Sequence, residues 1–227
     1  MGSLVGVALT AGYGLQTVGL QSIPSSTSAF LTALYVPLVP LGLWALTRRS
    51  PSAGASAGIG CAFTGLLLLT GATTAGLRLG PGEVITLVGT VAIAAEILLI
   101  GRFAGRVDAR RVTVVQLAVC ALLALAVRPV AGEPMPAPSW TLAAIVGALG
   151  VASAVIQVTM NWAQRSVAPT RATVIYAGEP VWAALIGRLA GERLTAGSLA
   201  GGALIVLAVI VSEQPLRRPV QNVVPPH

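Results

Sequence analysis

The chain of 227 residues is strongly hydrophobic: 55% of its residues are hydrophobic, only 9% are charged, and its mean hydropathy is +0.86. Because about a quarter of the residues in soluble domains are charged, this composition excludes an ordinary water-soluble globule. The formal net charge of +7 comes from arginines spread over short loops and helix ends, which does not favour a nucleic-acid-binding protein, whose basic residues gather in one patch.

Eight apolar stretches are long enough to cross about 30 Å of hydrocarbon at about 1.5 Å per residue. The first stretch lacks a basic region before it, so we interpret it as a retained helix rather than a signal peptide. The polar, Pro-rich tail over 213–227 is predicted to be disordered and cytoplasmic. In chain order, the predicted transmembrane helices cover residues 3–21, 27–47, 55–77, 83–102, 111–128, 139–161, 169–188 and 195–212. The sequence therefore predicts an all-α polytopic membrane protein.

Arginines are distributed unequally between alternate loops, with ten on one side and four on the other. The positive-inside rule makes the ten-arginine side cytoplasmic, and an even number of spans then places both termini there. The richer side holds Arg48, Arg49, Arg102, Arg106, Arg110, Arg111, Arg165, Arg171, Arg217 and Arg218, and the other holds Arg78, Arg128, Arg188 and Arg193.

The segment from Gln21 to Gly58 reappears 143 positions later in a single register. Five spans fit into this step, so the second copy is predicted to be inverted relative to the first, as in transporters that open a shared site to either side in turn. We divide the chain into an incomplete first repeat of three helices over 1–78 and a complete second repeat of five helices over 79–212. Matched pairs include Gln21 and Gln164, Thr27 and Thr170, Ala29 and Ala172, Pro37 and Pro180, and Gly58 and Gly201.

Both copies carry a proline and a pair of spaced glycines at corresponding places. Pro37 and Pro180 each remove an intrahelical hydrogen bond and predict a kink, which could either serve packing or free carbonyls toward a substrate site. The glycine pairs Gly54/Gly58 and Gly197/Gly201 predict a close seam between two helices.

Acidic side chains inside hydrocarbon are costly and usually face the interior of a bundle. Glu96 and Glu179 are such residues, so each could accept a proton, balance a cationic substrate, or be a neutral carboxyl bonded to a neighbouring helix. The full set of candidate substrate-binding residues adds the deeper polar and aromatic side chains: Gln16, Tyr35, Glu96, Gln157, Tyr176, Glu179 and Trp182. No Cys or His spacing predicts a metal site or a cofactor.

The last third of the chain resembles the closing helices of the EamA-type drug/metabolite transporters. The resemblance rests on the Glu-Pro-Val-aromatic-Ala-Ala helix that starts at Glu179, on Gly191-Glu192-Arg193 in the following turn, and on Gly201-Gly202 in the final helix. It implies a carrier of small metabolites or drugs in a bacterial cytoplasmic membrane, often an exporter. Such carriers usually have ten helices, so the resemblance also implies that the first repeat lacks two, through a start site upstream of Met1 or a natural eight-helix form.

The resulting prediction is a secondary-active exporter that works by alternating access, with the bilayer and a small-molecule substrate as partners; a homodimer is compatible with it. The shortened first repeat keeps a non-transporting scaffold or assembly subunit as the alternative. An intramembrane enzyme is less favoured, because the one histidine is the terminal His227 and only Glu96 and Glu179 could form a catalytic pair.

Overall fold

The computed structural model describes residues 1–48, 53–69, 79–129, 132, 136–167, 169, 172, 176, 179–193 and 195–213. Regular structure in these residues is helical, and no strand occurs among them. The predicted all-α fold is confirmed, whereas the predicted tail over 213–227 lies outside the described residues except for its first position.

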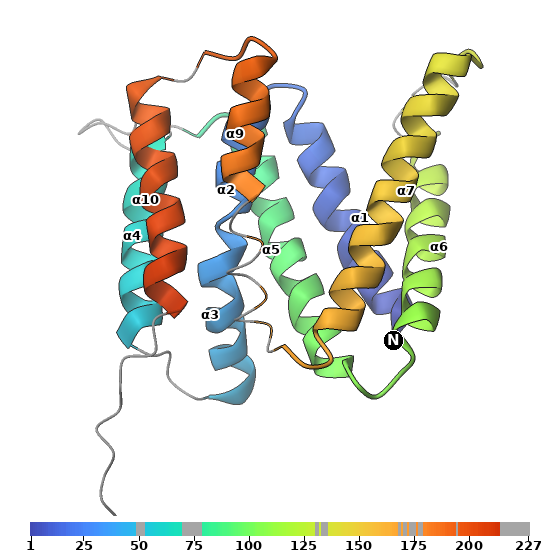
Figure 1. The fold of residues 1–227 in the computed structure, drawn as a ribbon, viewed down its shortest axis with the longest axis horizontal. Coiled ribbons are helices and arrows are strands. Elements are labelled where there is room, and N and C mark those ends of the chain that lie inside the picture. The colour runs from blue at the N-terminus through green and yellow to red at the C-terminus, as the bar shows by residue number, and fades with distance from the viewer. Residues whose placement is uncertain are drawn as a thin grey trace, which may run out of the picture.

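Where the structure describes them, the helices follow the predicted spans, with one interruption (Figure 1). Residues 70–77 of the predicted span 55–77, and residues 170–171, 173–175 and 177–178 of the predicted span 169–188, lie outside the described residues. The helix bounds are α1 (Gly2–Gly19), α2 (Ser25–Thr32), α3 (Tyr35–Thr47), α4 (Ala53–Leu69), α5 (Pro81–Phe103), α6 (Ala109–Val127), α7 (Trp140–Ala163), α9 (Glu179–Leu189) and α10 (Ala196–Glu213). Four helical stretches among the described residues are long and apolar enough to cross a membrane, namely Ser25–Thr47, Pro81–Phe103, Ala109–Val127 and Trp140–Ala163. A multi-pass membrane protein follows from these helices.

The stretch 27–47, predicted as one helix, is divided into α2 and α3. The break falls at Ala33 and Leu34, four and three residues before Pro37. Pro37 has no N–H with which to bond the carbonyl of Ala33; that carbonyl instead accepts from the N–H of Val36 at 3.1 Å. The chain therefore tightens locally and changes direction one turn before the proline.

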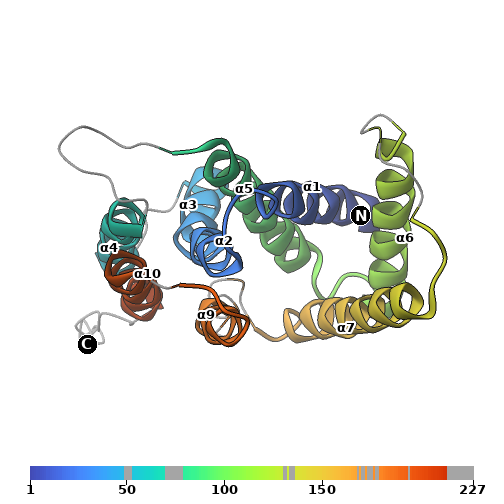
Figure 2. The same ribbon diagram turned by 90° about the horizontal axis from the view of Figure 1, so that it is seen from above.

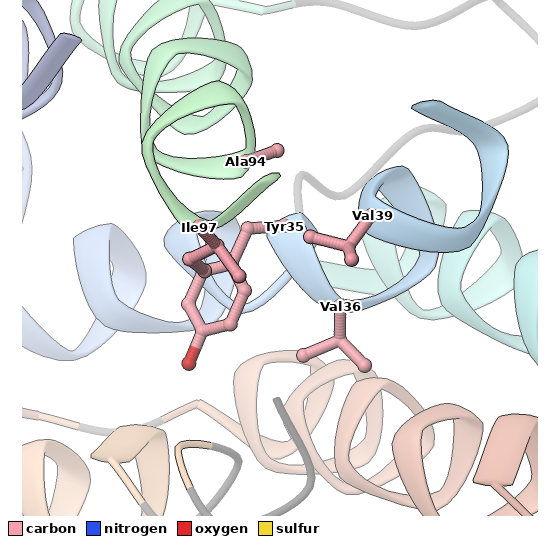
Figure 3. Packing of buried hydrophobic residues seen from close by; sticks show 5 residues of the cluster. All are labelled: Tyr35, Val36, Val39, Ala94 and Ile97. Carbon is pink, nitrogen blue, oxygen red and sulfur yellow. The ribbon is translucent and has the colours of Figure 1, made fainter. Parts of the chain in front are cut away.

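Side chains of α2 and α3 form much of the buried core. Tyr35, Val36 and Val39 of α3 pack against Ala94 and Ile97 of α5 (Figure 3). In two neighbouring clusters, α2 packs against α4 and α10; their buried members are Ile23, Leu31, Leu34, Ala62 and Ala208 in one, and Phe30, Ala33 and Ile205 in the other. The interrupted helix thus lies at the centre, between α5 on one side and the α4–α10 pair on the other (Figure 2).

Helix bounds in the two halves correspond when 143 is added to the first set. With this shift, the range of α4, 53–69, becomes 196–212, which matches the observed bounds of α10, Ala196–Glu213. The range of α3, 35–47, becomes 178–190, which matches the observed bounds of α9, Glu179–Leu189. Figure 1 shows that each helix of the first half runs opposite to its counterpart: α1 against α7, α3 against α9, and α4 against α10. This direction is what an inverted repeat requires, and the division into domains at residue 78 stays a prediction.

The described arginines separate between the two ends of the bundle. Those that end α3 and α5, begin α6 and follow α7 lie at the end where the N-terminus lies. Arg128 follows α6, Arg188 lies in the last turn of α9 and Arg193 follows α9, and both helices finish at the opposite end (Figure 1). Among the four candidate membrane spans, the rest of the protein covers α7 least, since only 6% of its apolar window is buried.

The contact between α4 and α10 depends on glycine. A Cβ atom added to Gly65 would lie 2.7 Å from the carbonyl oxygen of Gly201 and 2.8 Å from a side-chain carbon of Ile205. Gly54, Gly58 and Gly201 are buried, whereas Gly197 is exposed and has room for a Cβ atom at 3.4 Å from its nearest neighbour. The two helices therefore lie close together at Gly65, which the repeat pattern did not single out.

We predict that Gly65→Val destabilises the protein by about 1–3 kcal/mol, because the added side chain must push the α10 backbone away. Gly60→Val is the matched control on the same helix, since a Cβ atom at Gly60 meets nothing within 4 Å. Thermal unfolding in detergent should show a lower midpoint for the Gly65 variant alone. Equal midpoints for the two variants would contradict the tight seam.

Candidate functional site

A network of polar side chains is buried where α5, α6 and α7 meet. Gln116 of α6 donates its side-chain N–H to Glu96 of α5 at 3.0 Å and to the side-chain oxygen of Gln157 of α7 at 2.8 Å. Asn161, one turn after Gln157, donates to the Gln116 oxygen at 3.0 Å and to the Thr113 hydroxyl at 3.1 Å. All five side chains are buried, and Gln116 and Glu96 are 0% and 1% exposed. We refer to these five residues as the amide network.

The direction of these hydrogen bonds points toward Glu96. The amide of Asn161 donates to Gln116, and the amide of Gln116 donates to Glu96. Gln116 thus acts as a donor to Glu96, which suits a carboxyl group as acceptor. The described arginines lie at helix ends or in loops, so within the described part of the bundle amides rather than a cation surround this carboxyl.

The three tyrosines of the chain converge on the same region. Tyr13 of α1 interacts electrostatically with Glu96, Glu179 and Tyr176. Tyr35 of α3 interacts electrostatically with Glu179, Tyr176 and Tyr13. We call these five residues, Tyr13, Tyr35, Glu96, Tyr176 and Glu179, the central cluster. Its members come from α1, α3, α5, α9 and the segment just before α9, so they are far apart in sequence and only the fold brings them together.

Members of the central cluster differ in how accessible they are. Glu96 and Tyr35 are 1% and 3% exposed, whereas Tyr13 is 46% exposed and Glu179 is also exposed. The Tyr35 hydroxyl is buried and has no hydrogen-bond partner, and Figure 3 shows it directed away from the apolar side chains of its cluster. The cluster therefore combines enclosed polar groups with neighbours that can be reached from outside the core.

Not all predicted substrate-binding residues belong to this cluster. Gln157 joins through the amide network, but Gln16 donates to the Thr32 hydroxyl at 3.2 Å, where α1 meets α2. Trp182 is 64% exposed on α9, so its indole is not part of the buried network. Pro180 is the second residue of α9, and the segment before that helix is described only at residues 169, 172 and 176. The roles predicted for these residues stay predictions.

Sequence analysis did not select Tyr13, Thr113, Gln116 or Asn161 as candidates. A usable signal was present, because Thr113 and Gln116 are three residues apart and Gln157 and Asn161 are four apart. Such spacings place each pair on one face of its helix. Two predicted spans with polar pairs on one face would have suggested that those faces meet.

A groove of about 630 Å³ opens between α3 and α5 at some distance from these polar groups. Leu43 and Leu46 of α3 and Leu98, Leu99 and Arg102 of α5 contribute to its lining. None of the predicted substrate-binding residues lines the groove. We therefore place the candidate site at the central cluster.

A second polar contact connects the two halves at the end of the bundle opposite the N-terminus. The carboxylate of Glu192, between α9 and α10, accepts from the Ser25 N–H at 2.9 Å, the Ser25 hydroxyl at 2.6 Å and the Ser26 N–H at 3.3 Å. It therefore caps the first turn of α2 from the other half of the chain. Hydrogen bonds from Ser25 and Ser26 lower the pKa of the Glu192 carboxyl.

The described residues contain no group of three or more His, Cys, Asp or Glu side chains that could hold a metal ion. Cys61 and Cys120 are free thiols. The side chains of the central cluster are carboxyls and phenols, and those of the amide network add amides and one hydroxyl.

We predict that Gln116→Met lowers the stability of the protein by about 1–3 kcal/mol, because it leaves Glu96, Gln157 and Asn161 short of buried partners. The double variant Glu96→Met/Gln116→Met removes both partners of one hydrogen bond and should cost less than the sum of the single variants. Thermal unfolding in detergent measures all three. Additive losses would show that the amide network is not a coupled unit.

Comparison with known proteins relates this chain to transporters. A model of the EamA-like transporter family matches residues 80–213. An uncharacterized transporter from Archaeoglobus fulgidus is 26% identical over 211 residues, which make up 92% of this chain and 67% of that relative. A crystal structure of a protein with 23% sequence identity superposes with a TM-score of 0.66 over 93% of this chain and 74% of the other, which shows the shared fold. Since the family model matches more than half of the 227 residues, the chain belongs to the EamA-like transporter family.

Proposed function

We propose that the protein is a secondary-active exporter of small metabolites or drugs that binds its substrate at the central cluster and works by alternating access. We place it in a bacterial cytoplasmic membrane with both termini in the cytoplasm. Membership of a transporter family supports the general activity, and the distribution of arginines between the two ends of the bundle supports the orientation.

The observation that carries this proposal is the enclosed carboxyl of Glu96. A carboxyl inside hydrocarbon is expensive, and a role in packing alone could be filled by an apolar side chain of similar volume. Glu96 instead is buried and accepts a hydrogen bond from the amide of Gln116. Polar groups gathered at mid-membrane depth between the halves of a repeated structure are typical of substrate sites in secondary transporters.

Opposite directions of the paired helices support alternating access. In such a structure one half can rock against the other, so contacts between the halves at either end must form and break in turn. The Glu192 contact with Ser25 and Ser26 joins the halves at one end. We infer that it helps to hold that end closed and that it opens during the transport cycle.

Transport by the purified full chain in liposomes is the direct test. Three probes, leucine, benzyltrimethylammonium and succinate, cover zwitterionic, cationic and anionic solutes. We expect flux of at least one probe above that of protein-free liposomes, and a loss of about tenfold or more in Glu179→Gln, since this exposed carboxyl borders the site.

Glu83→Gln is the matched control, because Glu83 lies in the first turn of α5, away from the central cluster, and its flux should equal that of the unaltered chain. Retained binding without flux of any probe would favour the scaffold alternative. Unchanged flux in Glu179→Gln would remove this residue from the transport site.

For the Glu192 contact, we predict faster amide hydrogen exchange in the first turn of α2 when Glu192→Ala removes the acceptor. Exchange should rise severalfold for the peptide that contains Ser25 and Ser26 and stay unchanged in Glu83→Ala. Because the pKa of Glu192 is lowered in the folded protein, the contact is complete above the ordinary carboxyl pKa of about 4.3 and is lost as the pH falls through the lowered value. No change in α2 exchange would contradict a cap that closes this end.

A further inference from the structure

The groove between α3 and α5 is lined mainly by apolar side chains and carries one charge. Its volume of about 630 Å³ lies within the range of about 300–1,000 Å³ that is usual for small-molecule sites. The charged side chain among its described lining residues is that of Arg102, in the last turn of α5. The apolar lining includes Leu43, Leu46, Ala95, Leu98 and Leu99. The groove thus joins an apolar surface to one positive charge near the end of its helices.

The floor of the groove belongs to the buried core. Leu43 and Leu98 line the groove and also pack against the buried cluster around Tyr35. A Cβ atom added to Gly42 of α3 would lie 2.6 Å from the side chain of Leu98, so α3 and α5 are in close contact here. The shape of the groove is therefore fixed by the packing of the two helices.

The wall that α5 contributes continues the outward face of that helix. Val84, Val88 and Val91 are exposed and lead, at spacings of four, three and four residues, to Ala95 in the groove. Such spacings keep residues on one face of a helix. Ala95 and, on the opposite wall, Leu46 are both exposed. Because exposed apolar faces of a membrane-spanning helix meet lipid tails, the groove is open to the acyl chains of the bilayer.

Arg102 has a free guanidinium at the membrane boundary. It forms no hydrogen bond or ion pair with the described residues. Arg48 directly follows Thr47, which lines the opposite wall, so a second arginine stands at the same end of the groove. Trp44 is exposed one turn before Arg48, and exposed tryptophans are typical of the level of the lipid headgroups. The charged end of the groove therefore lies where phosphates of the bilayer are found.

These features specify an occupant. We propose that the groove binds an anionic phospholipid from the leaflet at this end, with an acyl chain against Leu43, Ala95 and Leu98 and its phosphate at Arg102. Apolar walls alone would select no lipid, because every lipid has similar tails; the selection comes from Arg102, since a guanidinium can hold a phosphate through two parallel N–H groups. A zwitterionic headgroup brings its own cation near the arginine and is bound less well. The site is separate from the central cluster and does not depend on transport.

Lipid selectivity is the first test. Purified full-length protein, freed of lipid in detergent, is titrated with phosphatidylglycerol and with phosphatidylcholine of the same acyl chains, and bound lipids are counted by native mass spectrometry. The first phosphatidylglycerol should bind about fivefold tighter than phosphatidylcholine, as expected for one arginine near anionic lipid. Equal binding of the two lipids overturns the proposal.

Charge variants locate the phosphate. Arg102→Gln should remove most of the preference for phosphatidylglycerol. Arg110→Gln is the matched control, because it removes the same charge from the first turn of α6, at the same end of the bundle but outside the groove, and it should keep the preference. Equal losses in the two variants would show that the preference reflects overall charge rather than this site.

Bulk variants locate the acyl chain. Ala95→Phe fills the groove and should weaken phosphatidylglycerol binding severalfold, whereas Val84→Phe, on the same exposed face of α5 but outside the groove, should not. Both positions are exposed, so neither change refills a core, and thermal unfolding checks that the fold is kept. Unchanged binding in Ala95→Phe overturns the proposal.

A soluble competitor separates a bound lipid from a bound phosphate group. Glycerol 3-phosphate in large excess should leave the first phosphatidylglycerol in place, because it has no acyl chain to fill the groove. Displacement of the lipid by this competitor would show that the site recognises a free phosphate, and the lipid assignment would be wrong.

Discussion

Low dielectric inside the bilayer is the constraint on which the arrangement of this protein depends. A carboxyl or amide that faces lipid tails loses its hydrogen bonds to water, so it must find partners on other helices. Glu96, Gln116, Gln157 and Asn161 meet this requirement together and thereby join α5, α6 and α7. Apolar packing between helices is weakly specific in lipid, so these bonds fix which faces of the three helices meet.

Close backbone packing complements the polar contacts at the other side of the molecule. Glycine at position 65 allows α4 to approach α10, and the interrupted α2–α3 segment fills the space between this pair and α5. The result is two differently built regions, one joined by small residues and one by hydrogen bonds. Between these regions, Tyr35 packs with Ala94 and Ile97 of α5, and its buried hydroxyl has no hydrogen-bond partner.

Function in the EamA-like transporter family requires that a packed membrane protein also be able to move. The Glu192 contact has the properties of a reversible connection, since it joins two halves through one charged group near the surface rather than through buried apolar area. Such a contact is strong enough to favour one arrangement and weak enough to exchange with water. In contrast, the amide network is enclosed and would be costly to open.

The sequence by itself determined the membrane environment, most helix positions and the repeat. These properties follow from local hydrophobicity, chain length and the fixed offset of 143, none of which depends on how helices face one another. It also indicated Glu96, Glu179, Tyr35, Tyr176 and Gln157 as single candidates. The kink at Pro37 was also predicted, because the missing N–H of proline is a local property. Only the tertiary structure decided that Tyr13 and Gln116 belong with these candidates and that Gln16 and Trp182 lie apart from the buried network. The physical reason is that helix rotation and pairing depend on hydrogen bonds and contacts between residues distant in the chain, which a local pattern does not contain.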